Sequence, residues 1–147
     1  QEPIDLAEEI GDLLEYYDVL AEEKAITLSL SGNGHLLGDR LMLRRAVSNL
    51  LSNALRHTPN GGSVTVQIDK GDDDMTHIAV ENTGSEIPQE HLPRLFDRFY
   101  RVDSSRQRTT ESSGLGLAIT QSIVTAHGGS VGVRSEDGKT RFTLSLP

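Results

Sequence analysis

Three segments of the chain space their apolar residues at helical intervals. Within residues 5–24 the large apolar side chains recur at steps of three and four, so that they share one face of a helix. They are Leu6, Ile10, Leu13, Tyr17 and Leu20. The same period predicts helices at 39–57, ended by a Thr-Pro-Asn-Gly-Gly run, and at 115–127, entered and left through glycine. Asp5 and Asp39 are expected to cap the first two helices.

Alternating apolar and polar residues predict strands between and after these helices. The expected strands are 26–31, 35–38, 63–69, 76–82, 130–135 and 140–146. Short polar turns join the third strand to the fourth and the fifth to the sixth, as in hairpins. A short helix is expected at 90–96, and the polar run at 103–113 is predicted to be mobile.

The order of these elements predicts an α+β fold, in which three helices cover one face of a mixed, mainly antiparallel sheet. The chain has 147 residues, of which 35% are hydrophobic, and this is enough for one compact domain but short for two. We therefore expect a single domain over residues 1–147.

Charge and cysteine content exclude several classes of function. The formal net charge of -8 argues against a nucleic-acid partner, because phosphate backbones are bound by clustered Lys and Arg. The absence of cysteine excludes disulfides and thiolate metal sites, and no apolar run has membrane-spanning length. A basic cluster is nevertheless present, and it can be interpreted either as a solvated helix face or as a local phosphate site. It consists of Arg40, Arg44, Arg45 and Arg56.

The second predicted helix carries two asparagines and an arginine along one edge. Asn49, Asn53 and Arg56 are four and three residues apart, which places them on the same side of a helix. Asparagine is a poor helix former, so packing alone does not explain the pair. Amide oxygens suit Mg²⁺, and a neighbouring guanidinium suits phosphate. Ordinary polar surface is the alternative interpretation.

Two further segments have features of a nucleotide site. The small-residue loop that contains Gly114 and Gly116 runs into the third helix, where free N–H groups and the helix dipole favour a phosphate. At the end of the fourth strand, Asn82 can accept a hydrogen bond from a base amine, and Gly84 lets the chain turn against a flat ring. Taken singly, each segment is equally well explained as an ordinary turn.

The order of these segments resembles the catalytic domain of sensor histidine kinases, members of the superfamily that also includes gyrase, Hsp90 and MutL. The resemblance covers the whole chain and implies the Bergerat fold, a two-layer α/β sandwich. Its motifs are an N-box at 49–58, a G1 box at 82–84, an F-box at 95–101, a G2 box at 114–117 and a final His-Gly-Gly at 127–129. The sequence of residues 92–103 is most similar to that of the copper- and heavy-metal-responsive branch of these kinases.

The resemblance implies ATP and Mg²⁺ as ligands and assigns a role to single residues. Asn53 would bind Mg²⁺, Asn49 would help to hold the metal and the phosphates, and Arg56 would reach the phosphates, so these three form the catalytic set. His57 would lie beside the adenine, and Asn82 would accept from its amine. The other nucleotide-site residues that the resemblance implies are Gly84, Ile87, Phe96, Arg98, Tyr100, Arg101, Ser113, Gly114, Leu115, Gly116 and Leu117.

The G1 box departs from the family pattern D-x-G-x-G at two positions. Asn82 stands where an aspartate meets the adenine, and Glu86 stands where the second glycine would be. Hydrogen bonds to a charged partner are roughly twice as strong as neutral ones. The departure at Asn82 therefore predicts loose binding of ATP.

Position 49 favours a kinase over an ATPase. Gyrase and Hsp90 hydrolyse ATP with a glutamate at this position, whereas the neutral amide of Asn49 cannot act as a general base. None of the five histidines lies in the acid-led phosphoacceptor motif of the family. The resemblance thus implies that the γ-phosphate is transferred to a histidine on a helical dimerisation domain outside this chain and then relayed to a response regulator.

The partners follow from the same resemblance. We expect this chain to be a monomeric, cytoplasmic part of a homodimeric inner-membrane sensor kinase in a copper or heavy-metal response. Two alternatives stay open, which are a degenerate pseudokinase that serves as a scaffold and an anti-sigma-factor serine kinase on the same fold. The long F-box with Phe96, Phe99 and Tyr100 favours the sensor kinase.

Overall fold

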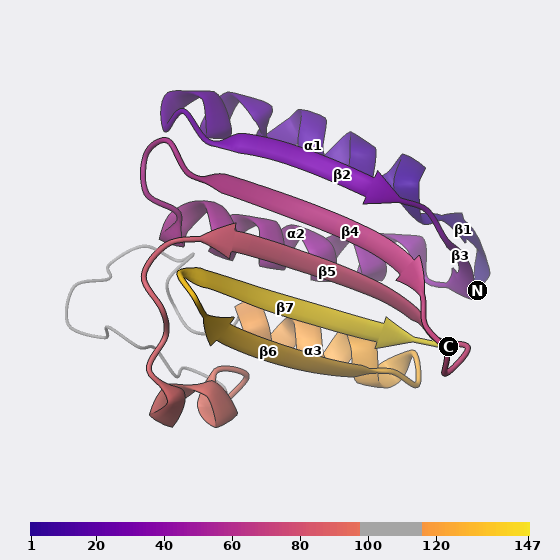
Figure 1. Ribbon diagram of the computed structural model, residues 1–147. Coiled ribbons are helices and arrows are strands. Elements are labelled where there is room, and N and C mark those ends of the chain that lie inside the picture. Colours follow the sequence, from indigo (N-terminus) through magenta and orange to yellow (C-terminus); the bar gives the residue numbers. More distant parts are fainter. Residues whose placement is uncertain (98–115) are drawn as a thin grey trace.

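The computed structural model describes residues 1–97 and 116–147, which form a sheet layer and a helix layer (Figure 1). The helices are α1 (Leu6–Glu23), α2 (Arg40–His57) and α3 (Gly116–Ala126). All three lie on the same face of the sheet, with α1 along β2, α2 across β4 and β5, and α3 across β6 and β7. The predicted two-layer α/β sandwich is confirmed.

The main sheet has five strands in the order β2-β4-β5-β7-β6. Their bounds are Thr27–Gly32 for β2, Ser63–Lys70 for β4, Thr76–Thr83 for β5, Lys139–Leu146 for β7 and Ser130–Glu136 for β6. Only β2 pairs in parallel, with β4, and the other three pairings are antiparallel. The sheet is therefore mixed and mainly antiparallel, as the sequence predicted.

The core lies between the sheet and α2. Every second residue of the central strands faces the helices and is buried, as expected for strands with one covered face. These residues include Val64, Val66, Ile68, Ile78, Val80, Phe142, Leu144 and Leu146. From α2, Leu43, Val47, Leu50 and Ala54 are buried against them. The other edge of α2 remains available to polar residues.

Both long helices begin at the predicted caps. The Asp5 carboxylate accepts from the amide of Glu8 at 3.2 Å, and the Asp39 carboxylate accepts from the amide of Met42 at 3.1 Å. The short helix expected at 90–96 is a 3₁₀ helix, η1 (Gln89–Arg94). The segment predicted to be mobile, 103–113, lies outside the described residues.

Two features at the start of the chain differ from the prediction. Leu20 is 49% exposed, and Ala21 is the buried residue of the last turn of α1. The Ala21 carbonyl accepts from the amide of Ile26 at 2.8 Å, so the chain that leaves α1 returns close to this residue. The strand β1 (Glu2–Asp5) was not predicted; it pairs antiparallel with β3 (His35–Gly38) in a separate sheet.

Within the described ranges, none of the helices combines the length and the apolar character needed to cross a membrane.

The burial along α1 can be tested with two truncations on one helix. Leu13 is 6% exposed, so Leu13→Ala should lower the free energy of unfolding by about 2–5 kcal/mol through lost burial and a cavity. Leu20→Ala should change it by less than about 1 kcal/mol because Leu20 faces solvent. Urea denaturation of both variants measures the difference, and equal losses would contradict the burial described.

Candidate functional site

The polar edge of α2 brings the three predicted residues together. Asn49, Asn53 and Arg56 are all half-buried on this helix. The Arg56 guanidinium donates to Asn53 Oδ1 at 3.2 Å, and the Asn49 amide donates through Nδ2 to the Gly116 carbonyl at 3.1 Å. The second contact joins residues 67 positions apart and places the start of α3 against the middle of α2. One residue of the N-box segment, Asn49, thus contacts one residue of the G2 segment, Gly116.

Asn82 lies at the end of β5 and is only 5% exposed. Its position alternates with Val80 and Ile78, so it stands on the face of the sheet that the helices cover. Nδ2 of Asn82 donates to the Thr83 carbonyl at 3.2 Å. This bond uses one N–H of the side-chain amide and helps to fix its orientation, while the amide oxygen is an acceptor that a ligand donor can use.

Gly84 is a position that only glycine fits. Its φ is +150°, and a Cβ there would lie 3.1 Å from the carbonyl oxygen of His57 and 3.3 Å from Cδ of Pro59. The loop after β5 is thereby packed directly on the end of α2. This contact brings Asn82, Gly84 and His57 into one region.

Glu86 has a role that the sequence did not indicate. Its carboxylate accepts from the amide of Gly138 at 3.1 Å, while the amide of Gly84 donates to the Gly138 carbonyl at 3.0 Å. Both contacts tie the loop after β5 to the turn between β6 and β7. The Asp137-Gly138 pair indicates a hairpin turn in the sequence, and its φ values of 54° and 73° confirm the turn, but nothing in the sequence links that turn to Glu86.

His57 lies at the last residue of α2 beside two positive charges. Desolvation by the surrounding chain, followed by the charges of Arg56 and Lys24, lowers the pKa of His57 below its usual value of 6.5. Lys24 is held nearby because its Nζ donates to the Leu55 carbonyl at 2.8 Å. The imidazole is therefore neutral at physiological pH, which suits a ring that contacts an uncharged base.

The remaining predicted residues fall into two groups. The Phe96 ring packs edge-on against Phe142 with centroids 5.9 Å apart, and the amide of Ile87 donates to Ser135 Oγ at 2.7 Å. The side chains of Phe96, Ile87 and Leu117 are partly buried and pack against the core. The predicted residues that lie outside the described ranges are Arg98, Tyr100, Arg101, Ser113, Gly114 and Leu115.

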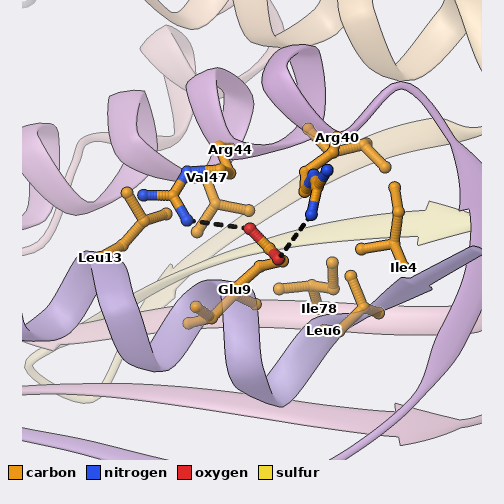
Figure 2. Close-up of a pocket in the computed structure, with 10 residues that line it drawn as sticks. Ile4, Leu6, Glu9, Leu13, Arg40, Arg44, Val47 and Ile78 are labelled. Carbon is orange, nitrogen blue, oxygen red and sulfur yellow. Dashed lines mark hydrogen bonds and ion pairs between the residues drawn. The ribbon is translucent and has the colours of Figure 1, made fainter. Parts of the chain in front are cut away.

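The basic cluster at the start of α2 is mostly structural. In Figure 2 the Glu9 side chain lies between Arg40 and Arg44, which contact it at 3.8 and 2.9 Å, above an apolar floor that includes Leu6 and Ile78. The Glu9 side chain is only 13% exposed, so its charge needs these partners. The void beside it holds about 10 Å³, the space of one water molecule. Of the two open interpretations, these ion pairs favour a structural helix face for Arg40 and Arg44.

Comparison with known families and relatives gives one consistent result. Residues 38–147 match the family described as histidine kinase-, DNA gyrase B-, and HSP90-like ATPase. The chain is 52% identical over 145 residues to the sensor histidine kinase CusS of Escherichia coli K12, covering 98% of this chain and 30% of that protein. It is 51% identical over 135 residues to the probable sensor kinase SilS of Salmonella typhimurium, covering 90% and 27%. The chain thus spans about 30% of the length of such curated relatives.

Solved structures show the same fold. The chain is similar to the mycobacterial sensor histidine kinase MprB, with a TM-score of 0.85, 31% identity, and coverage of 99% of this chain and 97% of that one. It is also similar to full-length ShkA, solved in complex with AMPPNP, with a TM-score of 0.84, 28% identity, and coverage of 99% and 30%.

The lowered pKa of His57 makes stability depend on pH. Because the folded state binds this proton less readily than the unfolded state, stability should be greatest above pH 6.5 and should fall as the pH drops below it. His57→Gln removes the titrating group and should flatten this part of the profile. Urea unfolding from pH 8 to pH 5 measures both proteins; identical profiles would show that His57 carries no such penalty.

Proposed function

The chain belongs to the histidine kinase-, DNA gyrase B-, and HSP90-like ATPase family, and on this basis we propose that it binds Mg-ATP and donates the γ-phosphate to a histidine of a sensor kinase. The observation that carries the proposal is the polar edge of α2. There Asn49, Asn53 and Arg56 lie together, and Asn49 is joined to Gly116 at the start of α3. This arrangement combines amide oxygens, a guanidinium and a helix N-terminus, which together suit a metal-bound phosphate chain.

The donor atoms fit Mg²⁺ held jointly by protein and nucleotide. Within the described ranges, no group of three or more His, Cys, Asp or Glu side chains could hold a metal by itself. Asn49 and Asn53 offer neutral amide oxygens one helical turn apart, and Mg²⁺ commonly completes such a partial set with phosphate oxygens and water. Asn53 and Asn49 are thus the residues that would hold the ion, which would neutralise phosphate charge during transfer.

Arg56 and Asn53 interact in a way that ATP would change. The Asn53 oxygen accepts from the Arg56 guanidinium at 3.2 Å, and a cation beside the same oxygen would repel that positive group. The phosphates offer Arg56 a stronger, charged partner. We therefore expect Arg56 to leave Asn53 and to contact the phosphates when nucleotide binds.

At the base end, Asn82 and His57 would recognise adenine. The buried Asn82 would accept from the exocyclic amine, and the neutral His57 ring would lie beside the base. Gly84 would contribute indirectly, because it lets the loop after β5 pack against the end of α2 beside His57. The similar chain ShkA was solved with AMPPNP, an ATP analogue, which supports the same class of ligand here.

We propose that the γ-phosphate is transferred to a histidine and not to water, because the residue at position 49 cannot act as a general base. A neutral amide at Asn49 cannot deprotonate a water molecule, and its Nδ2 is engaged with the Gly116 carbonyl. The acceptor would be a histidine on a helical dimerisation domain of the same kinase, and a response regulator would take the phosphoryl group from it. The names of the relatives, which are sensor kinases, support this relay and argue against the scaffold and serine-kinase alternatives.

We also propose that the complete protein is a homodimeric inner-membrane sensor kinase. This chain would be its cytoplasmic catalytic domain, which is a monomer when isolated. The similarity of residues 92–103 to the metal-responsive branch supports a copper or heavy-metal signal.

The weakness of the adenine contact is testable at Asn82. Asn82→Asp supplies a charged acceptor and should tighten binding of Mg-ATP about fivefold, since charged hydrogen bonds are about twice as strong as neutral ones. Asn82→Leu, of similar size but without an acceptor, should weaken binding. Calorimetric titration with Mg-ATP compares the three proteins, and equal or weaker binding by Asn82→Asp would refute the hypothesis.

The phosphoryl-transfer proposal is tested with γ-labelled ATP. The isolated chain should neither incorporate label nor release phosphate rapidly, whereas addition of the dimerisation domain of CusS should yield label on that added domain. Asn53→Ala should abolish the labelling. Label on the isolated chain, or rapid release of phosphate from it, would contradict the proposal.

A further inference from the structure

Helices α2 and α3 are joined by hydrogen bonds between side chains and backbone groups at several points along their contact. Asn49 donates to the Gly116 carbonyl at 3.1 Å, and Thr120 Oγ1 donates to the Ala46 carbonyl at 3.2 Å. Thr120 is fully buried, so its hydroxyl needs this partner. The earlier residue of α2, Ala46, is bonded to the later residue of α3, Thr120. The two helices therefore run antiparallel with a defined register.

A further bond lies at the opposite end of this helix pair. The amide of Asp39 donates to His127 Nε2 at 3.0 Å, and because an amide can only donate, Nε2 carries no proton. His127 Nδ1 lies 2.8 Å from the Ile123 carbonyl, which can only accept, so the proton is on Nδ1. Both bonds together require a neutral imidazole in one tautomer, placed between the end of α3 and the cap of α2.

The backbone at Gly38 and Gly128 restricts where the His127 ring can lie. A Cβ at Gly38, the residue before Asp39, would lie 2.8 Å from Cδ2 of the ring, so only glycine permits the contact. Gly128 follows with φ +81° and donates to the Thr125 carbonyl at 2.9 Å, an ending that fixes the last turn of α3. The ring is thus held from both sides by backbone geometry.

We propose that His127 is a positioning residue for the nucleotide site and acts through α3. By fixing the end of α3 on the start of α2, it sets where α3 begins and keeps the Gly116 carbonyl on Asn49. That bond uses one N–H of the Asn49 amide and orients the group, and the amide oxygen is the atom that can bind a cation. His127 and Gly116 are separated by roughly 16 Å along a helix that rises 1.5 Å per residue, so the effect depends on a stiff helix. The inference rests on the proposed function, because Asn49 matters here as a residue that holds Mg-ATP.

Two substitutions of His127 distinguish the effect of its two hydrogen bonds from the effect of its packing. His127→Phe keeps a ring but removes both hydrogen bonds, whereas His127→Gln can still accept from Asp39 and donate to Ile123. The control is Leu30→Ala on β2, which truncates a half-buried side chain at the far edge of the sheet from α3. It lowers stability without touching the α2 and α3 pair.

The measurement is the affinity for Mg-AMPPNP by calorimetry, at a temperature where all variants are folded. His127→Phe should weaken binding about fivefold, the effect of about one lost hydrogen bond, and His127→Gln should stay within about twofold of the wild type. Leu30→Ala should bind as the wild type does. Unchanged binding by His127→Phe, or equal weakening by Leu30→Ala, would overturn the proposal.

Amide hydrogen exchange in the unmodified chain gives a second measurement that does not depend on folding of a variant. Mg-AMPPNP should slow the exchange of the Asp39 amide, because that group and the nucleotide bind the two ends of one helix pair. An unchanged rate with nucleotide bound would overturn the proposal.

If the wild type binds no nucleotide, the proposed function itself has failed. In that case His127→Phe should still speed exchange of the Thr120 amide about fivefold in the nucleotide-free chain, and an unchanged rate would refute the positioning role.

Discussion

Helix α2 has to satisfy two environments at once, and the rest of the structure depends on how it does so. One face is buried against the central strands through Leu43, Val47, Leu50 and Ala54, while the adjoining edge carries Asn49, Asn53 and Arg56. The period of 3.6 residues keeps these two sets apart over the whole helix. Burial of the apolar face therefore fixes the direction of the polar edge, and α3 and the loop after β5 are packed on that edge.

The polar groups of the site are held by the rule that buried donors need partners. Asn49 and Asn82 each donate one N–H to a backbone carbonyl, which orients both side-chain amides. The loop that follows Asn82 and strand β5 is fixed by Gly84 and Glu86 to the Gly138 turn. Side chains fixed in this way lower the ordering cost of binding a ligand, and this gain would offset part of the weakness of the proposed neutral contact with adenine.

Much of this arrangement could be predicted from the sequence, because it follows from local periodicity. The helices, their caps at Asp5 and Asp39, and the hairpins all came from patterns within a few residues. What failed depended on contacts between distant segments. Ala21 replaces Leu20 in the core because the chain returns over it, and the pairing of Glu86 with Gly138 spans 52 residues. The basic cluster could not be assigned either, since its partner Glu9 lies on another helix.

If Mg²⁺ is held by the amide oxygen of Asn53, as proposed, nucleotide binding depends on magnesium through this one side chain. Calorimetric titration with ATP, with Mg²⁺ and with EDTA, on the wild type, Asn53→Ala and the control Ser52→Ala from the same helix tests this dependence. We expect Mg²⁺ to strengthen binding in the wild type and in Ser52→Ala, and Asn53→Ala to lose this gain. Full magnesium dependence in Asn53→Ala would show that the metal is bound elsewhere.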